Sequence, residues 1–214
     1  MTAAKMTDTP LTFFHSPNTR SFGTLVLLDE LGAPYQMHLL NMKQNEQRSP
    51  DYLAINPMGK VPAIEHNGGL VTEQGAVFIY LADAFPDAGL APAIGDPLRG
   101  PYLRWIAFYG SSFEPAIVDR AMTHAPVPQS TSPYGDFDTM FQTLDDQLAK
   151  GPYILGERFT AADVLWGTAL TWTTGFGICP KTPAIEAYLE RWNARPSVAR
   201  AKAKDAELAA AQEA

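Results

Sequence analysis

A histidine and a serine lie side by side near the start of this 214-residue chain, in the run Phe14-His15-Ser16-Pro17-Asn18. Such a pair could suggest a hydrolase, in which an imidazole takes the proton of a nucleophilic hydroxyl. Residues 11–15 are expected to form a strand, however, and adjacent strand residues point to opposite faces. We therefore expect no serine triad. Ser16 precedes a proline, which favours a helix start with Ser16 as N-cap.

A second stretch, residues 56–76, combines several unusual backbone requirements. Residues 61–65 and 70–72 are β-rich runs joined by Asn67-Gly68-Gly69, a sequence that tolerates the positive φ of a hairpin turn. Thr72 is the expected N-cap of the helix that follows. Pro62 removes a hydrogen-bond donor from its strand, which is usual only at an edge or bulge. A cis Val61–Pro62 bond would let Val61 offer its backbone to an extended peptide, although trans proline is the more frequent form.

The composition predicts a soluble globular protein with a full core, because 46% of the residues are hydrophobic. No run of about 18 apolar residues exists and the first ten residues lack a signal-peptide core, so we expect a cytoplasmic protein that does not enter membranes. The single cysteine, Cys179, excludes a disulfide framework and a multi-cysteine metal site, and the four histidines are scattered. A net charge of −7 disfavours nucleic-acid binding.

The order of the expected elements predicts an α/β domain followed by an all-α domain. Strands at 11–15 and 35–40 flank a helix at 19–31 that ends at Gly32, and an irregular helical segment lies within 41–53. With the hairpin and its helix, the order is βαβ, then α, then ββα, which is the arrangement of a thioredoxin-like domain.

Helix-breaking residues between 86 and 101 predict a linker, so we place a first domain at 10–86, a linker at 87–101 and an all-helical domain at 102–214. Thr160 and Asp163 form a capping box at the start of one helix. The other expected helices are 102–122, kinked if Pro115 lies inside it, 136–150, 184–194 and 196–204, with a fraying tail at 205–214.

The run Asn-Pro-x-Gly-Lys-Val-Pro-Ala at 56–63, the hairpin, Thr-Glu-x-x-Ala at 72–76 and Tyr-Leu-Ala-x-x-Phe-Pro at 80–86 resemble the glutathione-binding half of the cytosolic glutathione S-transferases. The resemblance extends over nearly the whole chain. It implies glutathione as co-substrate, no metal, a detoxifying transferase activity and a homodimer. It also implies a cis Pro62, with Val61 pairing with the cysteinyl backbone of glutathione.

The resemblance also assigns the remaining glutathione contacts. Phe14 falls where some members carry a tyrosine donor, and Arg20 falls where others carry a cysteine. Ser16 matches the donor of the bacterial-type serine or threonine branch, with Asn18 as a second polar donor. Thr19 and Ser21 are fallbacks. Gln47 and Lys60 resemble ligands of the glycyl carboxylate, Glu73 matches the acidic ligand of the γ-glutamyl end, and Gln74 departs from the usual serine.

The second substrate, a small hydrophobic electrophile, is expected between the two domains. The residues assigned to its pocket are His15, Tyr102, Trp105, Tyr109, Phe113 and Trp172. Two alternatives stay open for these: aromatic residues at helical spacing are often core residues, and His15 could be a buried structural side chain. Three alternatives to transfer also stay open, namely a glutathione-dependent disulfide oxidoreductase, glutathione-dependent isomerisation or ether cleavage, and a non-catalytic binding protein of the same fold.

Overall fold

The computed structural model describes residues 10–213, which form two compact units. The first unit contains the described residues up to Ala88 and those from Arg200 onward, and the second is Gly89–Ala199. We expected the second domain to run from 102 to the end of the chain. The structure differs there, because the contacts of the residues from Arg200 onward are with the first unit.

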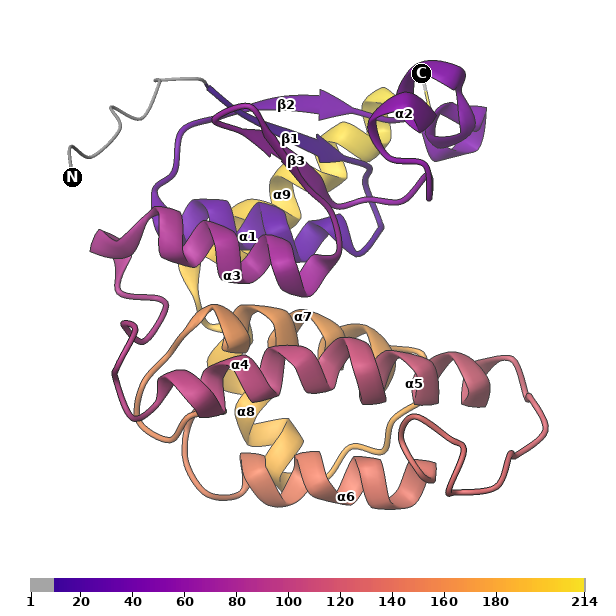
Figure 1. Cartoon of the computed structure of the whole chain (residues 1–214), viewed down its shortest axis with the longest axis vertical. Helices are drawn as coiled ribbons and strands as arrows, with labels where there is room; N and C mark the ends of the chain where they lie inside the picture. Colours follow the sequence, from indigo (N-terminus) through magenta and orange to yellow (C-terminus); the bar gives the residue numbers. More distant parts are fainter. Residues whose placement is uncertain (1–9, 214) are drawn as a thin grey trace. The chain divides into compact units, whose positions relative to one another are not determined.

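The described part of the first unit is built on a four-stranded sheet with the order β2-β1-β3-β4. The strands are β1 (Leu11–His15), β2 (Tyr35–Leu39), β3 (Ala63–His66) and β4 (Gly69–Val71). The β1–β2 pair is parallel, and the β1–β3 and β3–β4 pairs are antiparallel. Helices α1 (Ser21–Leu31) and α3 (Gln74–Ala84) contact each other on one face of this sheet (Figure 1). The predicted thioredoxin-like order is confirmed.

Two local signals in the sequence have the predicted effect. Gly32 ends α1 in the left-handed region at φ 60°, where its N–H donates to Asp29 O at 3.2 Å. The turn between β3 and β4 has positive φ at both Asn67 and Gly68, as a tight hairpin requires.

The segment between β2 and β3 consists of short helical pieces. These are η1 (Met42–Gln44), η2 (Glu46–Arg48) and α2 (Pro50–Ile55). Asn41 begins the first, because its Oδ1 accepts from Lys43 N at 3.0 Å, and Ser49 caps the third by accepting from Tyr52 N at 3.2 Å. The irregular helical segment expected at 41–53 is therefore confirmed, but it ends at Ile55.

The second unit contains helices and connecting loops. The short helix η3 (Pro86–Ala88) still belongs to the first unit. The helices of the second unit are α4 (Arg99–Phe108), the π-helical turn η4 (Tyr109–Phe113), α5 (Glu114–Ala121), α6 (Phe137–Leu148), α7 (Ala161–Gly175), α8 (Pro183–Asn193) and the start of α9 (Pro196–Ala211). We expected one long helix over 102–122, kinked if Pro115 lies inside it. The structure has a continuous helical run over 99–121 that contains Pro115 and widens to a π-helical turn just before it. A proline lacks an N–H and its ring crowds the carbonyl four residues earlier, here that of Ser111.

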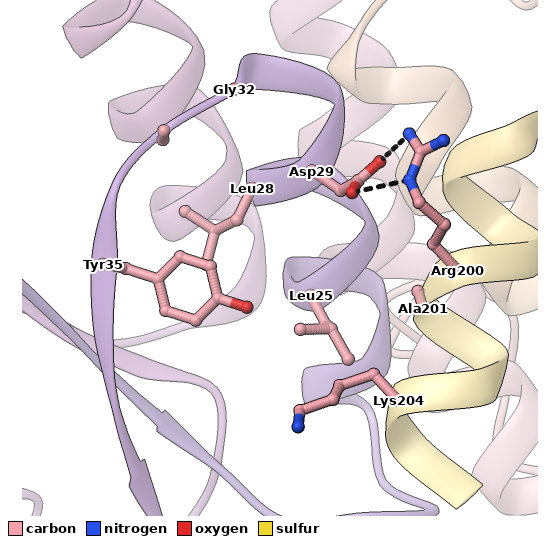
Figure 2. Close-up of a pocket in the computed structure, with 9 residues that line it drawn as sticks. Leu25, Leu28, Asp29, Gly32, Tyr35, Arg200, Ala201 and Lys204 are labelled. Atoms are coloured by element: carbon pink, nitrogen blue, oxygen red, sulfur yellow. Dashed lines mark hydrogen bonds and ion pairs between the residues drawn. The ribbon is translucent and has the colours of Figure 1, made fainter. Parts of the chain in front are cut away.

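Helix α9 corrects a second expectation, a helix ending near 204 and a fraying tail. It continues to Ala211 because polar side chains from Arg200 onward bind the first unit. Arg200 donates from Nε to Asp29 Oδ1 at 3.1 Å and from Nη2 to Asp29 Oδ2 at 2.5 Å (Figure 2). Gln212 donates to Leu40 O at 3.1 Å. The Arg200–Asp29 pair lines a pocket together with Tyr35 and Lys204 (Figure 2). The volume of this pocket is about 290 Å³.

The start of α7 confirms the predicted capping box. Thr160 N donates to Asp163 Oδ2 at 2.8 Å, and Ile154 N and Tyr188 Oη donate to Oδ1 at 2.7 and 3.1 Å. Burial nevertheless outweighs these hydrogen bonds and raises the pKa of Asp163 to about 6.

We predict that Gly167→Ala destabilises the protein, because a Cβ at Gly167 would lie 2.3 Å from Cδ2 of the buried Trp192. Overpacking of this kind costs about 1–3 kcal/mol of unfolding free energy. Gly175→Ala in the same helix is the matched control, since a Cβ there meets nothing within 4 Å. Urea denaturation should show a lower unfolding free energy than that of the wild type for Gly167→Ala and not for Gly175→Ala. Equal midpoints for the two would contradict this packing.

We also predict a pH-dependent difference between the wild type and Asp163→Asn. The pKa of Asp163 is higher in the folded than in the unfolded state, so the folded state binds the extra proton between about pH 4 and 6. Stability from this group is therefore present at low pH and is lost as the pH rises through about 6. The advantage of the wild type over Asp163→Asn in unfolding free energy should fall across that window and then level off. A difference that grows with pH would show that the carboxylate form is the one the fold prefers.

Candidate functional site

The candidate site is organised by the loop between β1 and α1, residues 16–20. In the β1–β3 ladder, Phe14 is opposite Ala63. Because antiparallel partners run in opposite directions, two further steps along each chain would bring Ser16 opposite Val61. Continued past its last pair, the register would therefore place together the two residues that the sequence assigned to opposite sides of one site.

Ser16 has a fixed backbone and an unpaired hydroxyl. Its N–H donates to Ser21 Oγ at 3.2 Å, and its carbonyl accepts from Thr19 Oγ1 at 2.7 Å and Ser21 Oγ at 3.1 Å. The hydroxyl has no hydrogen-bond partner among the described residues, although the residue is only 1% exposed. A ligand atom that reaches this hydroxyl would find an uncommitted donor.

The alternative role of Ser16 as an N-cap is wrong, and the helix expected from Thr19 begins two residues later. Helix α1 begins at Ser21, after Arg20, and Asn18 turns the chain with φ 57° before the helix starts. The left-handed conformation at Asn18 is incompatible with a helix that runs from Pro17, and asparagine is among the residues that tolerate it best. Asn18 itself is exposed, and its N–H donates to Asp205 Oδ2 at 3.0 Å.

His15 belongs to the interior and not to a substrate wall. It has no exposed surface; its Nδ1 lies 2.8 Å from Ser21 Oγ and its Nε2 lies 3.0 Å from Asp205 Oδ1. The second contact has the distance of an ion pair but not the alignment of a hydrogen bond. The structure thus corrects the assignment of His15 to the second-substrate pocket and agrees with the buried structural role.

Val61 presents an unpaired stretch of backbone. The Val61–Pro62 bond is cis, and neither the N–H nor the C=O of Val61 has a hydrogen-bond partner in the described part of the chain. The preceding carbonyl, of Lys60, is in contrast doubly bound, by Tyr52 Oη at 2.6 Å and by Asn56 Nδ2 at 2.9 Å. The turn is fixed on one side of Val61, and the polar groups of Val61 itself are left for an extended ligand, as in β-strand addition.

A glycine is required in the turn that leads to Val61. Gly59 has φ +58°, and a Cβ on it would lie 2.6 Å from the backbone oxygen of Gln47. Arg48 Nη1 donates to Met58 O at 3.2 Å from the same side. The helical segment 42–55 therefore packs directly against this turn.

The N-terminus of α3 provides a second polar feature in the first unit. Glu73, and not the expected Thr72, is its N-cap, with the uncommon φ of 63°. Non-glycine residues with positive φ are strained and concentrate at ligand sites. The unpaired N–H groups of a first helical turn favour an anion. Gln74 donates from Nε2 to Arg20 O at 3.2 Å, so its amide joins α3 to the β1–α1 loop.

Gln47 and Lys60, the expected ligands of the glycyl carboxylate, lie on the two segments that meet at Gly59. Gln47 Nε2 donates to Asn45 Oδ1 at 3.0 Å, and the Lys60 side chain is exposed. Their role in binding stays a prediction.

The aromatic residues assigned to the second-substrate pocket lie in the second unit and gather around Trp166. Its ring centroid is 6.1 Å from that of Trp105, 5.8 Å from Tyr109 and 5.0 Å from Phe113. These three and Tyr102 are at most 5% exposed. This is core packing, the alternative that the sequence left open. Trp172 is half-buried and packs against the exposed Phe176.

Two further findings concern what the described residues do not contain. No group of three or more His, Cys, Asp or Glu residues is arranged to hold a metal ion in this part of the chain. None of the described helices combines the length and apolarity needed to cross a membrane.

Sequence reasoning missed three residues that shape the site. Tyr52 and Asn56 hold the Lys60 carbonyl, and Asp205 binds the Asn18 N–H. Asn56 lies inside the motif that was recognised, but its side-chain role is not visible in the pattern. Asp205 is 187 positions from Asn18, and no local signal marks it.

Two family models and several known proteins match this chain. The family described as "Glutathione S-transferase, N-terminal domain" matches residues 9–83, and "Glutathione S-transferase, C-terminal domain" matches residues 134–191. Glutathione S-transferase GstA of Escherichia coli O157:H7 is 27% identical, covering 86% of this chain and 94% of that protein. Disulfide-bond oxidoreductase YfcG of Escherichia coli K12 is 25% identical, covering 89% and 94%. A glutathione transferase homologue from Sulfitobacter, solved with bound glutathione, is 30% identical with a TM-score of 0.72, covering 91% and 98%.

We predict that Tyr52→Phe lowers the unfolding free energy by about 1 kcal/mol, the usual net value of one buried hydrogen bond. The lost bond is the 2.6 Å contact with Lys60 O. Tyr80→Phe is the matched control, because it removes a hydroxyl 3.0 Å from His66 Nδ1 at a more exposed position. Urea denaturation should rank Tyr52→Phe as the less stable variant. The reverse order would mean that the phenol does not hold the turn.

Proposed function

Because this chain belongs to the glutathione S-transferase family, we propose that it activates glutathione as a thiolate with the Ser16 hydroxyl and transfers it to a small hydrophobic electrophile. The chain is a glutathione-dependent enzyme with glutathione as co-substrate. Three points are proposed beyond this: Ser16 as the hydrogen-bond donor to the sulfur, a small hydrophobic electrophile as the second substrate, and transfer rather than disulfide reduction as the reaction.

The observation that carries the proposal is the presence of unpaired polar groups on both chains just beyond the last pair of the β1–β3 ladder. The backbone of Val61 is free to bind a peptide in extended form, and the hydroxyl of Ser16, two steps beyond the last ladder pair, is free to donate. A cysteinyl residue bound along Val61 would direct its side chain toward the loop that carries Ser16. Glu73 and the first turn of α3 suit the ammonium and carboxylate of the γ-glutamyl end.

The chemistry of the transfer follows from the sulfur. A thiolate is the nucleophile, and a hydrogen bond to the anion favours the loss of the proton. Sulfur then forms a bond to the electrophilic carbon, and the leaving group departs with the bonding electron pair. Each tenfold gain in the thiolate fraction corresponds to about 1.4 kcal/mol, which one charge-assisted hydrogen bond can supply.

A second candidate is a glutathione-dependent disulfide oxidoreductase. It is favoured by the exposed Asn18 beside Ser16 and by the similarity to YfcG. In that reaction two glutathione molecules are oxidised to one glutathione disulfide, and the substrate disulfide is reduced to two thiols. Formation of glutathione disulfide in equal amount with reduction of a small disulfide would favour this candidate over transfer.

We also propose that the chain forms a homodimer and is cytoplasmic, on the basis of the family alone. Light scattering coupled to size-exclusion chromatography tests the first of these. A mass near the 23.3 kDa of one chain would contradict it.

We predict that Ser16→Ala raises the pKa of the bound glutathione thiol by about one unit and lowers the conjugation rate near neutral pH roughly tenfold. Glutathione affinity should stay within a few-fold, because the contacts at Val61 do not change. Ultraviolet absorbance of the bound thiolate, titrated against pH, measures the effect. Ser16→Thr keeps a hydroxyl and is the control.

Two outcomes would contradict parts of this proposal. An unchanged titration in Ser16→Ala would show that another group activates the thiol. The same titration on Asn18→Ala would then test the second polar donor. Absence of a thiolate band in the wild type would contradict the proposed activation itself.

A further inference from the structure

The carboxylate of Asp205 on α9 bridges two residues of the strand and loop that carry Ser16. Its Oδ2 accepts from Asn18 N at 3.0 Å, and its Oδ1 lies 3.0 Å from His15 Nε2. Asp205 is 7% exposed and His15 is fully buried. The contact with Asn18 is the well-aligned hydrogen bond of the two, because the contact with His15 lacks hydrogen-bond alignment.

The bridge continues through the interior to the backbone of Ser16. His15 Nδ1 lies 2.8 Å from Ser21 Oγ, and Ser21 Oγ contacts the N–H of Ser16 at 3.2 Å and its carbonyl at 3.1 Å. Asp205 thus contacts the loop in two ways. Its Oδ2 accepts a hydrogen bond from Asn18 N, and its Oδ1 lies against His15, which contacts Ser21, whose hydroxyl binds the backbone of Ser16.

A buried carboxylate at this position is not explained by stability alone. Removal of a charge from water is costly, and a well-packed apolar pair often stabilises a fold as much as a buried ion pair. Anchoring of α9 does not require it either. Arg200 already binds Asp29 through two hydrogen bonds, and Gln212 binds Leu40 O. Asp205 differs from these anchors because it contacts the loop of the candidate site.

We infer that Asp205 is a positioning residue, which fixes the left-handed turn at Asn18 and so aims the Ser16 hydroxyl at the bound sulfur. This inference rests on the proposed function, because it gives Ser16 the role of donor. The N–H of Asn18, whose φ is 57°, donates to Asp205 Oδ2, so loss of that carboxylate removes a protein hydrogen bond that holds the turn. A displacement of about 1 Å at a reacting group can cost as much as 100-fold in rate.

The test compares Asp205→Ala with Arg200→Ala. Both remove one anchor of α9 on the first unit, but only Asp205 touches the β1–α1 loop. Asp205→Ala should raise the pKa of the bound thiol and lower kcat roughly tenfold, with KM for glutathione within about threefold. Arg200→Ala should leave the thiol titration and kcat as in the wild type, since its ion pair is exposed on the Arg200 side.

Asp205→Asn serves as the conservative variant. Its amide oxygen still accepts from Asn18 N, so it should recover most of the wild-type titration and kcat. It also keeps the inference testable if Asp205→Ala does not fold. A full loss of kcat in Asp205→Asn, with a wild-type melting temperature, would overturn the assignment of the Asn18 contact as the decisive one.

Hydrogen exchange of residues 16–20 separates this inference from the proposed function, because it needs no activity. Faster exchange of this loop in Asp205→Ala than in Arg200→Ala supports the tether even if glutathione gives no thiolate band. Equal exchange and equal titrations in the two variants would overturn the inference while Ser16→Ala still tests the donor.

Discussion

The structure depends on where the β1–β3 ladder stops. Phe14 and Ala63 are its last pair, and beyond them one chain turns into the loop of Ser16 while the other continues into the cis Val61–Pro62 bond. Backbone groups left unpaired in a folded protein are costly unless water or a ligand takes them. The unpaired N–H and C=O of Val61, within the described part of the chain, are therefore the constraint around which the site is built.

The surrounding elements keep this edge open and in place. Tyr52 and Asn56 hold the Lys60 carbonyl, so the turn before Val61 cannot close onto it. Ser21 and Thr19 saturate the backbone of Ser16 but leave its hydroxyl unpaired. Helix α9 adds an anchor from the far end of the chain. The site thus combines fixed backbone with unsatisfied polar groups, which is what preorganised binding requires.

The parts of this arrangement that the sequence predicts are those that rest on local chemistry. Gly32 ends a helix and Asn67-Gly68 makes a hairpin because both need left-handed backbone, and Thr160 with Asp163 forms a capping box over one turn. Positions 56–63 were recognisable because their spacing is itself the motif. The sequence indicated Thr72 as the N-cap, whereas the structure has Glu73 there. The sequence could not predict this, because positive φ at a glutamate is rare and no local pattern indicates it.

The parts that sequence could not predict depend on contacts between distant segments. Asp205 begins the Ala- and Glu-rich stretch 205–214, for which the sequence predicts fraying, and only the fold brings it to Asn18 and His15. The same fold buries His15, which its strand position alone could not decide, and surrounds Trp166 with aromatic residues that had been assigned to a pocket.

A crystal structure of the protein with reduced glutathione tests the central claim most directly. The account predicts that the cysteinyl backbone hydrogen-bonds to both the N–H and the C=O of Val61, with the sulfur within hydrogen-bond distance of Ser16 Oγ. A complex in which glutathione leaves the Val61 backbone unpaired, or in which the sulfur faces away from Ser16, would contradict it.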